Sequence, residues 1–354
     1  MHVLRHIDRN KFHMDFLVQT THPAPFDDEI KKLGSKVIIC PGFPNPWKTA
    51  KNFNHVLRKH GPYDVVHSHI HNFSGFILKL AYQAGVPIRI AHSHIDLSAL
   101  KVNAGLYRRM YLRLTEFWIN KYSTSGLACS KQAASDLFGF TLTKDIRWKV
   151  FHCSIDLSFF KNTINSRITV RQQLGIPDDA FVVGHVGSFS PHKNHKFLVD
   201  IFSRILNFEP RGYLLLVGDG SLKPIIEQQV SIKGLSDRVI FAGLRADVPR
   251  LMCRAMDVFL FPSLFEGLPV VLLEAQSSGL PCVISNVISE EVDVVKSLIR
   301  KVALSKSPSV WAEEVLAMRD VMRAVTKLEA LTIFEQSSFN IMNNIRELER
   351  FYTL

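Results

Sequence analysis

Short apolar runs and amphipathic stretches alternate through the second half of the chain. The apolar runs have the length of strands and cover residues 181–187, 212–218, 239–243, 258–261 and 281–285. Stretches with helical spacing lie between them, at 194–206, 222–233, 248–256 and 270–276. Strands and helices that alternate in this way predict a parallel sheet covered by helices on both faces. Ligands of such sheets bind beyond the carboxyl ends of the strands, which is where Gly187, Gly218, Gly243 and Glu266 fall.

The first half of the chain shows the same alternation less regularly. Its strand candidates are 14–18, 36–40, 64–68, 88–92, 127–130 and 148–151. A polar and then turn-like stretch at 157–180 is typical of an interdomain connection. We therefore predict an α/β protein with one Rossmann-like domain at 1–160 and a second at 161–338. The remaining residues, 339–354, are expected to form a helix that packs back on the first domain.

Two glutamates, Glu266 and Glu274, flank the start of a predicted helix. The run from Pro262 to Ala275 follows an apolar strand and contains a loop, Glu266-Gly267-Leu268-Pro269, directly before the helix. Backbone N–H groups at a helix N-terminus can hold an anion or a sugar hydroxyl. Glu274 would lie two turns into an apolar helix, where a carboxylate is costly to bury without a partner. A capping acid and a surface acid are the alternative interpretation.

A lysine follows the first strand of the second half. In the run Gly187-Ser188-Phe189-Ser190-Pro191-His192-Lys193, a glycine ends the strand and a lysine precedes the helix. This order places a flexible cation at the edge that carries Glu266, where it could bind a diphosphate; a solvated loop lysine is the alternative. The nearby Gly218-Asp219-Gly220 lacks the third glycine of a dinucleotide-binding fingerprint.

These segments together resemble the family-4 glycosyltransferases, which have the two-domain GT-B fold. In the second half the resemblance rests on Gly187–His195, Leu215–Gly220, Val239–Gly243 and Asp257–Ala275. In the first half it rests on Tyr63–His69, Arg89–His94, Ala128–Lys131 and Ser154–Asp156. The resemblance is greatest to bacterial members that build exopolysaccharide or O-antigen. It implies two Rossmann-like domains facing across a cleft, and transfer of a sugar from a nucleotide diphosphate donor, UDP first among the expected bases. It further implies retention at the anomeric carbon and no metal, and the chain contains no Asp-x-Asp pair of the kind that holds a divalent ion.

The resemblance also implies roles for individual residues. Lys193 would neutralise the diphosphate, and Glu274 would bind the ribose. The donor sugar and phosphates would be contacted by Gly187, Ser188, Glu266, Gly267, Leu268, Pro269 and Val270. Leu244 and Arg245 would border the base, and His94 would lie near the reaction centre on the acceptor side. No cofactor is expected beyond the nucleotide-sugar co-substrate. For His94 a structural or solvated role is the alternative, and His67, His69, His71, His92 and His94 together also suggest a metal site.

Two departures from the family pattern bear on activity. Ser188 stands where many members have an arginine that shares the diphosphate with the lysine. Family members also open with a strand and a glycine-rich loop, whereas the first glycine here is Gly34, so the resemblance predicts an incomplete N-terminal domain. A catalytically impaired fragment or a non-catalytic assembly subunit is therefore the alternative to an active transferase, and a nucleotide-sugar epimerase is a third hypothesis.

The charge of the chain is concentrated in its first half. Residues 1–165 contain 22 Lys and Arg against 11 Asp and Glu, whereas residues 166–354 contain 21 of each. An anionic partner such as a membrane surface or a phosphorylated lipid is expected there, since no nucleic-acid motif is present. The acceptor would then be a growing glycan or a polyprenyl-diphosphate-linked one. Residues 106–118 combine aromatic residues on one helical face with arginines off it, which suits a helix at a membrane interface or one docked on the sheet. The five scattered cysteines favour the cytoplasm, and the basic first half favours the inner face of the membrane.

Overall fold

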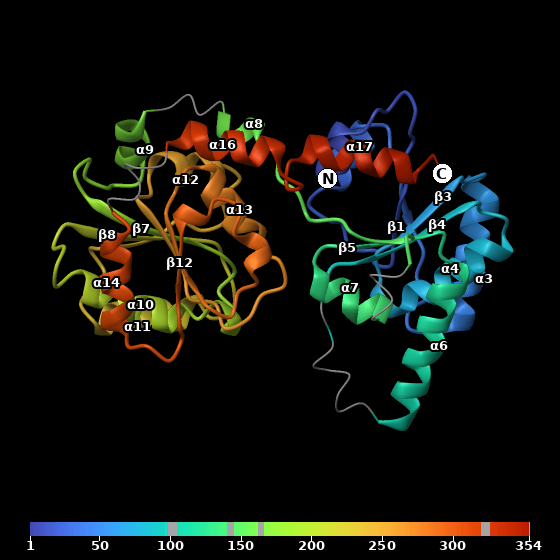
Figure 1. Cartoon of the computed structure of the whole chain (residues 1–354), viewed down its shortest axis with the longest axis horizontal. Coiled ribbons are helices and arrows are strands. Elements are labelled where there is room, and N and C mark those ends of the chain that lie inside the picture. The colour runs from blue at the N-terminus through green and yellow to red at the C-terminus, as the bar shows by residue number, and fades with distance from the viewer. Residues whose placement is uncertain (96, 98–104, 140–144, 162–165, 320–325, 354) are drawn as a thin grey trace. The chain divides into compact units, whose positions relative to one another are not determined.

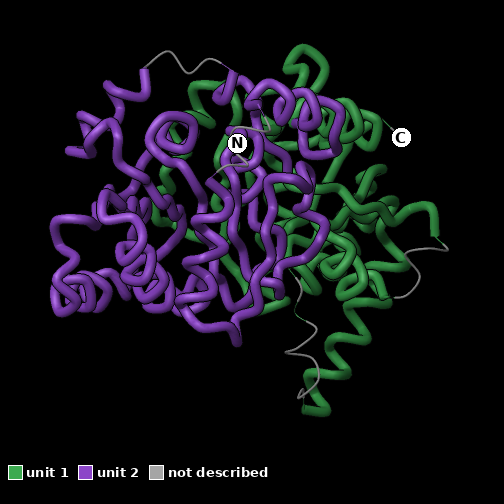
Figure 2. Tube along the Cα trace, turned by 60° about the vertical axis from the view of Figure 1, so that its left-hand side comes forward, with its two compact units in different colours: residues 1–153, 341–354 green, residues 154–340 purple. Residues whose placement is uncertain are grey.

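The computed structural model describes the whole chain except residues 96, 98–104, 140–144, 162–165, 320–325 and 354. It contains two compact units, shown in two colours in Figure 2. Unit 1 comprises residues 1–153 and 341–354, and unit 2 comprises residues 154–340. Each unit is an α/β body with parallel strands (Figure 1), so the predicted fold class is confirmed.

Unit 2 is built on one six-stranded sheet in which all neighbouring strands are parallel. The strand order is β12-β11-β10-β7-β8-β9. The strands are β7 (Phe181–Val186), β8 (Gly212–Val217), β9 (Val239–Phe241), β10 (Val258–Phe261), β11 (Cys282–Ser285) and β12 (Ile299–Val302). The first five fall inside the predicted runs, whereas β12, with the sequence Ile-Arg-Lys-Val, was missed because its two central residues are charged.

Helices cover both faces of this sheet, as the unbroken apolar strands predict. One face carries α10 (His195–Ile205), α11 (Lys223–Ile232) and α14 (Pro308–Ala317), and the other carries α8 (Ser158–Lys161), α9 (Arg167–Gln173), α12 (Val248–Arg254), α13 (Val270–Ser277) and α16 (Lys327–Gln336). Short 3-10 turns cover Pro191–Lys193, Glu290–Val292 and Lys296–Leu298. Val182 and Phe259 pack on one side of the sheet, while their neighbours Val183 and Leu260 pack on the other. Strand residues alternate between faces, which explains why both sides are apolar.

Unit 1 has two separate parallel sheets among its described strands. The smaller pairs β1 (Phe16–Val18) with β2 (Val37–Ile39), and the larger has the order β3-β4-β5-β6. The strands of the larger sheet are β3 (Val65–Ser68), β4 (Ile88–Ser93), β5 (Ser125–Ala128) and β6 (Trp148–Val150). The helices are α1 (His2–His6), α2 (Asp27–Lys32), α3 (Pro46–His60), α4 (Ser74–Gln83), α6 (Leu106–Tyr122), α7 (Lys131–Phe138) and α17 (Ile341–Phe351), with a 3-10 turn at His71–Phe73.

The chain passes between the units at positions that differ slightly from those expected. Residues 154–160, which the sequence analysis assigned to the first domain, belong to unit 2. Ile155, Leu157 and Phe160 are buried in the core of that unit, and the Ile155 N–H donates to the carbonyl oxygen of Phe339 at 2.9 Å. At the other crossing, the Asn344 side chain donates to the His152 carbonyl at 2.7 Å, within unit 1. These three buried apolar side chains set the boundary between the units, and the sequence analysis did not recognise them in a stretch that is mostly polar.

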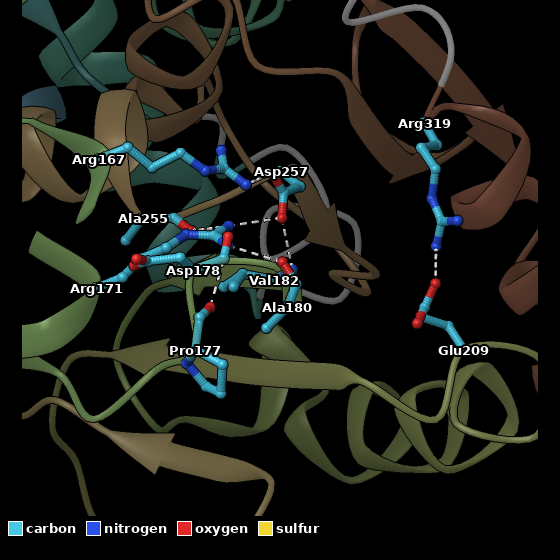
Figure 3. A network of polar contacts seen from close by, with 10 residues as sticks. All are labelled: Arg167, Arg171, Pro177, Asp178, Ala180, Val182, Glu209, Ala255, Asp257 and Arg319. Carbon is cyan, nitrogen blue, oxygen red and sulfur yellow. Dashed lines mark hydrogen bonds and ion pairs between the residues drawn. The ribbon is translucent and has the colours of Figure 1, made fainter.

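A buried carboxylate joins three elements of unit 2 at the start of β10 (Figure 3). Asp257 accepts from Arg171 at 2.7 Å, from Arg167 at 2.6 Å and from the Val182 N–H at 2.7 Å. The Arg171 side chain is fully buried and also donates to the carbonyl oxygens of Asp178, Ala180 and Ala255. The network therefore ties α9 to the beginnings of the two central strands, β7 and β10.

Replacing Arg171 with methionine is expected to destabilise unit 2 strongly. Breaking a buried pair leaves an uncompensated charge, and such changes cost about 3–5 kcal/mol. Urea denaturation of the full chain, followed by circular dichroism, measures the loss. Arg211→Met is the matched control, because its pair with Asp179 is exposed and such pairs contribute about 1 kcal/mol or less. Equal losses of stability in the two variants would contradict the conclusion that the Asp257 network stabilises unit 2.

Candidate functional site

Loops from neighbouring strands meet at the carboxyl-terminal edge of the unit 2 sheet. The loop after β7 is bonded on one side to the loop after β10, since the Leu264 N–H donates to the His192 carbonyl at 2.8 Å. The Asn194 side chain adds a bond to the Pro262 carbonyl at 3.1 Å. On its other side, the Phe189 N–H donates to the Asp219 carbonyl in the loop after β8, at 3.0 Å. The three loops therefore form one continuous backbone structure.

Lys193 and Glu266 form an ion pair across two of these loops. The Lys193 Nζ lies 2.7 Å from the Glu266 Oε1, and only 13% and 11% of the two side chains are exposed. The ammonium also lies 4.7 Å from the centre of the Phe261 ring, close enough for a cation–π interaction. Asn194, in the left-handed conformation with φ 57°, turns the chain from the 3-10 turn into α10 directly after the lysine. Two predicted site residues that are distant in sequence are thus in contact.

Glu274 is a partly buried carboxylate in α13. Neither a hydrogen bond nor an ion pair reaches its carboxylate from the described part of the chain. Burial raises the pKa of Glu274 to about 7. The helix begins at Val270, after the loop that holds Glu266. Pro269 has no N–H, so the amides that a ligand could use at this terminus are those of the residues on either side of Pro269. A carboxylate in this position has capacity for a ligand with hydroxyl donors.

The glycines of two loops allow their backbones to touch. Gly218 has φ +139°, and a Cβ there would lie 2.1 Å from the Gly187 carbonyl oxygen. The Gly187 N–H donates to the Val217 carbonyl at 3.0 Å. The Gly218-Asp219-Gly220 run therefore has a packing role between the loops after β7 and β8. Ser188 lies in the first of them, with its hydroxyl 3.0 Å from that of Ser190.

The loop after β9 holds the residues expected at the base. Leu244 is 81% exposed, and the Gly218 N–H donates to the Gly243 carbonyl at 2.9 Å, which places this loop at the same sheet edge. The Arg245 guanidinium donates twice to Asp247, at 2.7 and 2.9 Å. This contact lowers the pKa of Asp247 to about 2. Arg245 is therefore engaged by a neighbour that the sequence analysis did not consider.

Two buried histidines beneath Lys193 were also missed. The rings of His185 and His195 lie edge to face with their centres 4.8 Å apart, and His185 Nδ1 is 2.9 Å from the Leu260 carbonyl oxygen. Burial lowers the pKa of both rings; His195 and Lys193 add repulsion at His185, and Lys193 and His192 add it at His195, whose pKa falls to about 4. They are therefore neutral packing residues that support the lysine. His185 lies near the end of β7 and His195 at the start of α10, on either side of the loop that holds Lys193. These positions in the sequence could have predicted that both side chains lie close to the site.

His94 lies in unit 1, in a set of stacked imidazoles. We define the histidine column as His67, His69, His92 and His94, whose rings stack with centre distances of 4.2–5.1 Å. His94 is exposed, and its Nε2 is 2.7 Å from the His69 Nδ1. Burial, with repulsion from neighbouring rings, lowers the pKa of His67, His69 and His92. The pKa of His69 falls to about 4, although this residue is exposed. His71, the fifth histidine of the sequence prediction, pairs instead with Asp136 at 2.9 Å.

A cavity of unit 2 lies at the opposite end of the strands. It measures about 300 Å³ and is lined by Arg167, Asp179, Ala180, Phe181, Glu209, Arg211, Asp257 and Arg319. Its three arginines each face a carboxylate, as Figure 3 shows for two of them. These charges are mutually neutralised, whereas the carboxyl-terminal edge also holds Glu274, a carboxylate without a partner among the described residues, and this difference distinguishes that edge as the site.

Comparison with known proteins identifies the class to which this fold and site belong. The family model for "Glycosyl transferases group 1" matches residues 180–319. EpsF of Bacillus subtilis strain 168, named as a glycosyltransferase, is 36% identical over 317 residues, which cover 89% of this chain and 82% of EpsF. The chain belongs to the group 1 glycosyl transferases.

More distant relatives agree with this assignment. An Escherichia coli protein named UDP-Gal:alpha-D-GlcNAc-diphosphoundecaprenol alpha-1,3-galactosyltransferase is 30% identical over 241 residues, or 65% of this chain and 60% of that protein. Anabaena HepE, solved in complex with UDP, has a TM-score of 0.77 at 21% identity and covers 97% of this chain and 100% of its own. WaaG, a glycosyltransferase involved in lipopolysaccharide biosynthesis, has a TM-score of 0.65 at 19% identity, covering 100% and 92%. The fold is therefore that of the GT-B glycosyltransferases, and the chain is a transferase.

Substituting Glu274 with glutamine is expected to change how stability depends on pH. An acid whose folded pKa is raised from 4.5 to about 7 binds more protons folded than unfolded across that interval, so stability falls as the pH rises through it. The variant escapes this loss: it should match the unsubstituted chain at pH 4 and exceed it by roughly 2–3 kcal/mol at pH 8. Denaturation at both pH values measures the difference. Glu313→Gln, at an exposed helical position, is the control, and parallel behaviour of both variants would refute the assignment.

Proposed function

We propose that this chain transfers a sugar from a nucleoside diphosphate sugar, with UDP as the base, to a growing glycan or a lipid-linked acceptor in cell-surface polysaccharide synthesis. The observation that carries the proposal is that one sheet edge holds both a shielded cation, Lys193, which contacts Glu266, and a buried carboxylate, Glu274, that has no partner among the described residues. UDP and UDP-glucose occupy the solved structures of HepE, and an undecaprenol-linked acceptor appears in the name of the E. coli relative. These relatives support the donor and acceptor classes.

The donor diphosphate would enter where Lys193 now contacts Glu266. A phosphate oxygen would compete with the Glu266 carboxylate for the ammonium, leaving Glu266 to accept hydrogen bonds from hydroxyls of the donor sugar. Unpaired N–H groups at the start of α13, from Gly267, Leu268 and Val270, would face the growing negative charge of the leaving group. Glu274, ionised at neutral pH once hydroxyls bind it, would accept from the two ribose hydroxyls.

Stabilisation of the leaving diphosphate by a lysine and a helix N-terminus requires no divalent ion, and we propose a metal-independent reaction with no cofactor beyond the donor. We also propose retention at the anomeric carbon, with His94 on the acceptor side. These points follow from the resemblance described above, and the anomeric configuration of the product, read by NMR, is the direct test of retention. Activity that requires added Mn²⁺ or Mg²⁺ would refute metal independence.

Donor binding should depend on Lys193 and Glu274. Charge-assisted hydrogen bonds contribute about 1.5–3 kcal/mol, so Lys193→Ala and Glu274→Ala should each weaken UDP-glucose binding by roughly 10- to 150-fold. Isothermal titration against UDP-, GDP- and ADP-sugars measures this and selects the base. Lys196→Ala, which removes an exposed lysine at the start of α10, three residues after Lys193, is the control. No saturable binding of any donor, or equal affinities in all variants, would refute the proposal.

A non-catalytic assembly subunit is a second candidate, favoured by Ser188. A serine hydroxyl bonded to Ser190 replaces the cation that the family pattern places beside the lysine. A subunit of this kind would bind the donor without transferring its sugar. Incubation with donor and a GlcNAc-diphosphate-lipid acceptor separates the two candidates, because only the transferase produces a longer glycan, while donor loss without acceptor would indicate an epimerase.

Membrane contact through α6 forms part of the proposal. The described part of the chain contains no helix long and apolar enough to cross a membrane. The part of α6 from Thr115 onward packs against α4. The two helices approach closely there, since a Cβ at Gly75 of α4 would lie 2.3 Å from the Thr115 carbonyl oxygen. The earlier turns extend away in Figure 1 and expose Leu106, Tyr107, Met110, Tyr111 and Leu114. The exposed turns support the proposed contact with a membrane surface, and the turns beyond them are docked on unit 1.

Removing the arginines of α6 should weaken binding to anionic vesicles. Each basic residue near an anionic surface contributes about 1 kcal/mol, so Arg108→Gln, Arg109→Gln and Arg113→Gln combined should lower partitioning on the order of 100-fold. Sedimentation with phosphatidylglycerol vesicles measures it. Arg58→Gln with Lys59→Gln, exposed on α3 of the same unit, is the control. Equal binding to neutral phosphatidylcholine vesicles, or no effect of the triple substitution, would exclude the electrostatic contact.

A further inference from the structure

We propose that the histidine column of unit 1 binds a transition-metal ion of the zinc class through His67, His69 and His92. The site is separate from the donor residues of unit 2, and its test does not depend on sugar transfer. Two features carry the inference: convergence of the ring nitrogens of His67, His69 and His92, and hydrogen-bond partners that orient two of these rings.

The sheet brings the four rings together by simple geometry. β3 and β4 are parallel neighbours, with Ser68 opposite Ala91. Side chains alternate between faces along a strand, so His67 and His69 point to one side and His92 and His94 to the same side of the next strand. The repeated His-Ser-His therefore becomes a ladder of imidazoles at the carboxyl ends of two strands.

The ligand atoms are close enough for one ion. His67, His69 and His92 each offer a ring nitrogen, and these nitrogens lie within 4.8 Å of one another. His67 Nε2 and His92 Nδ1 are 3.0 Å apart. Nitrogens at about 2.0–2.1 Å from a tetrahedral zinc ion lie about 3.4 Å from each other, so ring rotations that adjust these separations would bind one. His69 is exposed and His92 is buried, which gives the ion an approach from solvent.

The surroundings orient the rings as a metal site requires. The Tyr352 hydroxyl lies 2.8 Å from His67 Nδ1, and fixing one ring nitrogen presents the other to an ion. His94 Nε2 holds His69 Nδ1 in the same way at 2.7 Å. His92 Nδ1 faces His67 Nε2, whereas its buried Nε2 has no hydrogen-bond partner among the described residues, so Nδ1 is the nitrogen that His92 would offer to the ion.

The donor set selects the class of ion. Imidazole nitrogens suit Zn²⁺, Cu²⁺ and Ni²⁺, whereas Mg²⁺ and Ca²⁺ require oxygen ligands. Asp136, a carboxylate of the same unit, contacts His71 instead and is not among the three converging residues. An ion bound here would join the ends of β3 and β4 and, through Tyr352, the segment that follows α17, and would therefore stabilise unit 1.

Titration of the full chain with Co²⁺ and Zn²⁺ tests the proposal. After treatment with a chelator, the protein should bind one Co²⁺ with visible absorption bands typical of tetrahedral coordination, and one Zn²⁺ should displace it. His69→Gln, at an exposed position that spares the core, should weaken Zn²⁺ binding by at least about 10-fold, and Tyr352→Phe by about 10- to 100-fold through the lost orientation of His67. Zn²⁺ should also raise the melting temperature of the unsubstituted chain.

His55→Gln is the matched control, because it removes an exposed histidine of unit 1 outside the histidine column. It should leave Zn²⁺ affinity unchanged. The proposal is overturned if the unsubstituted chain and His69→Gln bind Zn²⁺ equally, or if His55→Gln causes the same loss, since either result would indicate adventitious binding to surface histidines. Circular dichroism of each variant establishes that it is folded.

Discussion

The buried pairing of Asp257 with Arg171 fixes the central strands of unit 2 and, through them, the position of the site. Asp257 stands directly before β10 and accepts from the N–H of Val182 in β7, so it aligns the beginnings of the two strands. The opposite ends of the same strands lead to Glu266 and Lys193. Because the strands are short and fully buried, a shift at their beginnings would move both side chains at their ends. The ion pair that stabilises the fold therefore lies at the opposite end of the strands from the charged residues of the candidate site.

The charged residues of the candidate site are less completely paired than Arg171 and Asp257. Arg171 and Asp257 satisfy each other with several further hydrogen bonds, which is the condition under which buried charges are tolerated. Lys193 and Glu266 satisfy each other only partly, and Glu274 has a raised pKa and no partner among the described residues. Such a carboxylate costs stability when it ionises, and a ligand that donates hydrogen bonds to it restores the loss. Functional sites commonly retain local arrangements of this kind that destabilise the folded chain.

The sequence predicted the parallel sheets and most strands of unit 2, because buried strands leave an unbroken apolar signal. It also placed Lys193 and Glu266 at one edge, since parallel strands end together. It failed for three different reasons: β12 carries charges at its centre, residues 154–160 join unit 2 through three buried side chains, and the side chain of Arg245 is held by its near neighbour Asp247. The stacking of His67 on His92 depends on strand register, which no local pattern reveals.

Unit 1 shows how far apart in sequence the determinants of one cluster can be. Leu348 and Phe351 of α17 pack with Ile88, Ile90 and Leu127 on one face of the larger sheet, although they lie at the other end of the chain. This packing brings Tyr352, the next residue, to His67 at 2.8 Å. The orientation of the histidine column thus depends on apolar contacts of a helix that belongs to unit 1 although it follows all of unit 2 in sequence. A substitution in α17 such as Leu348→Ala would therefore alter His67 without touching it, by loosening the hydroxyl that holds its ring.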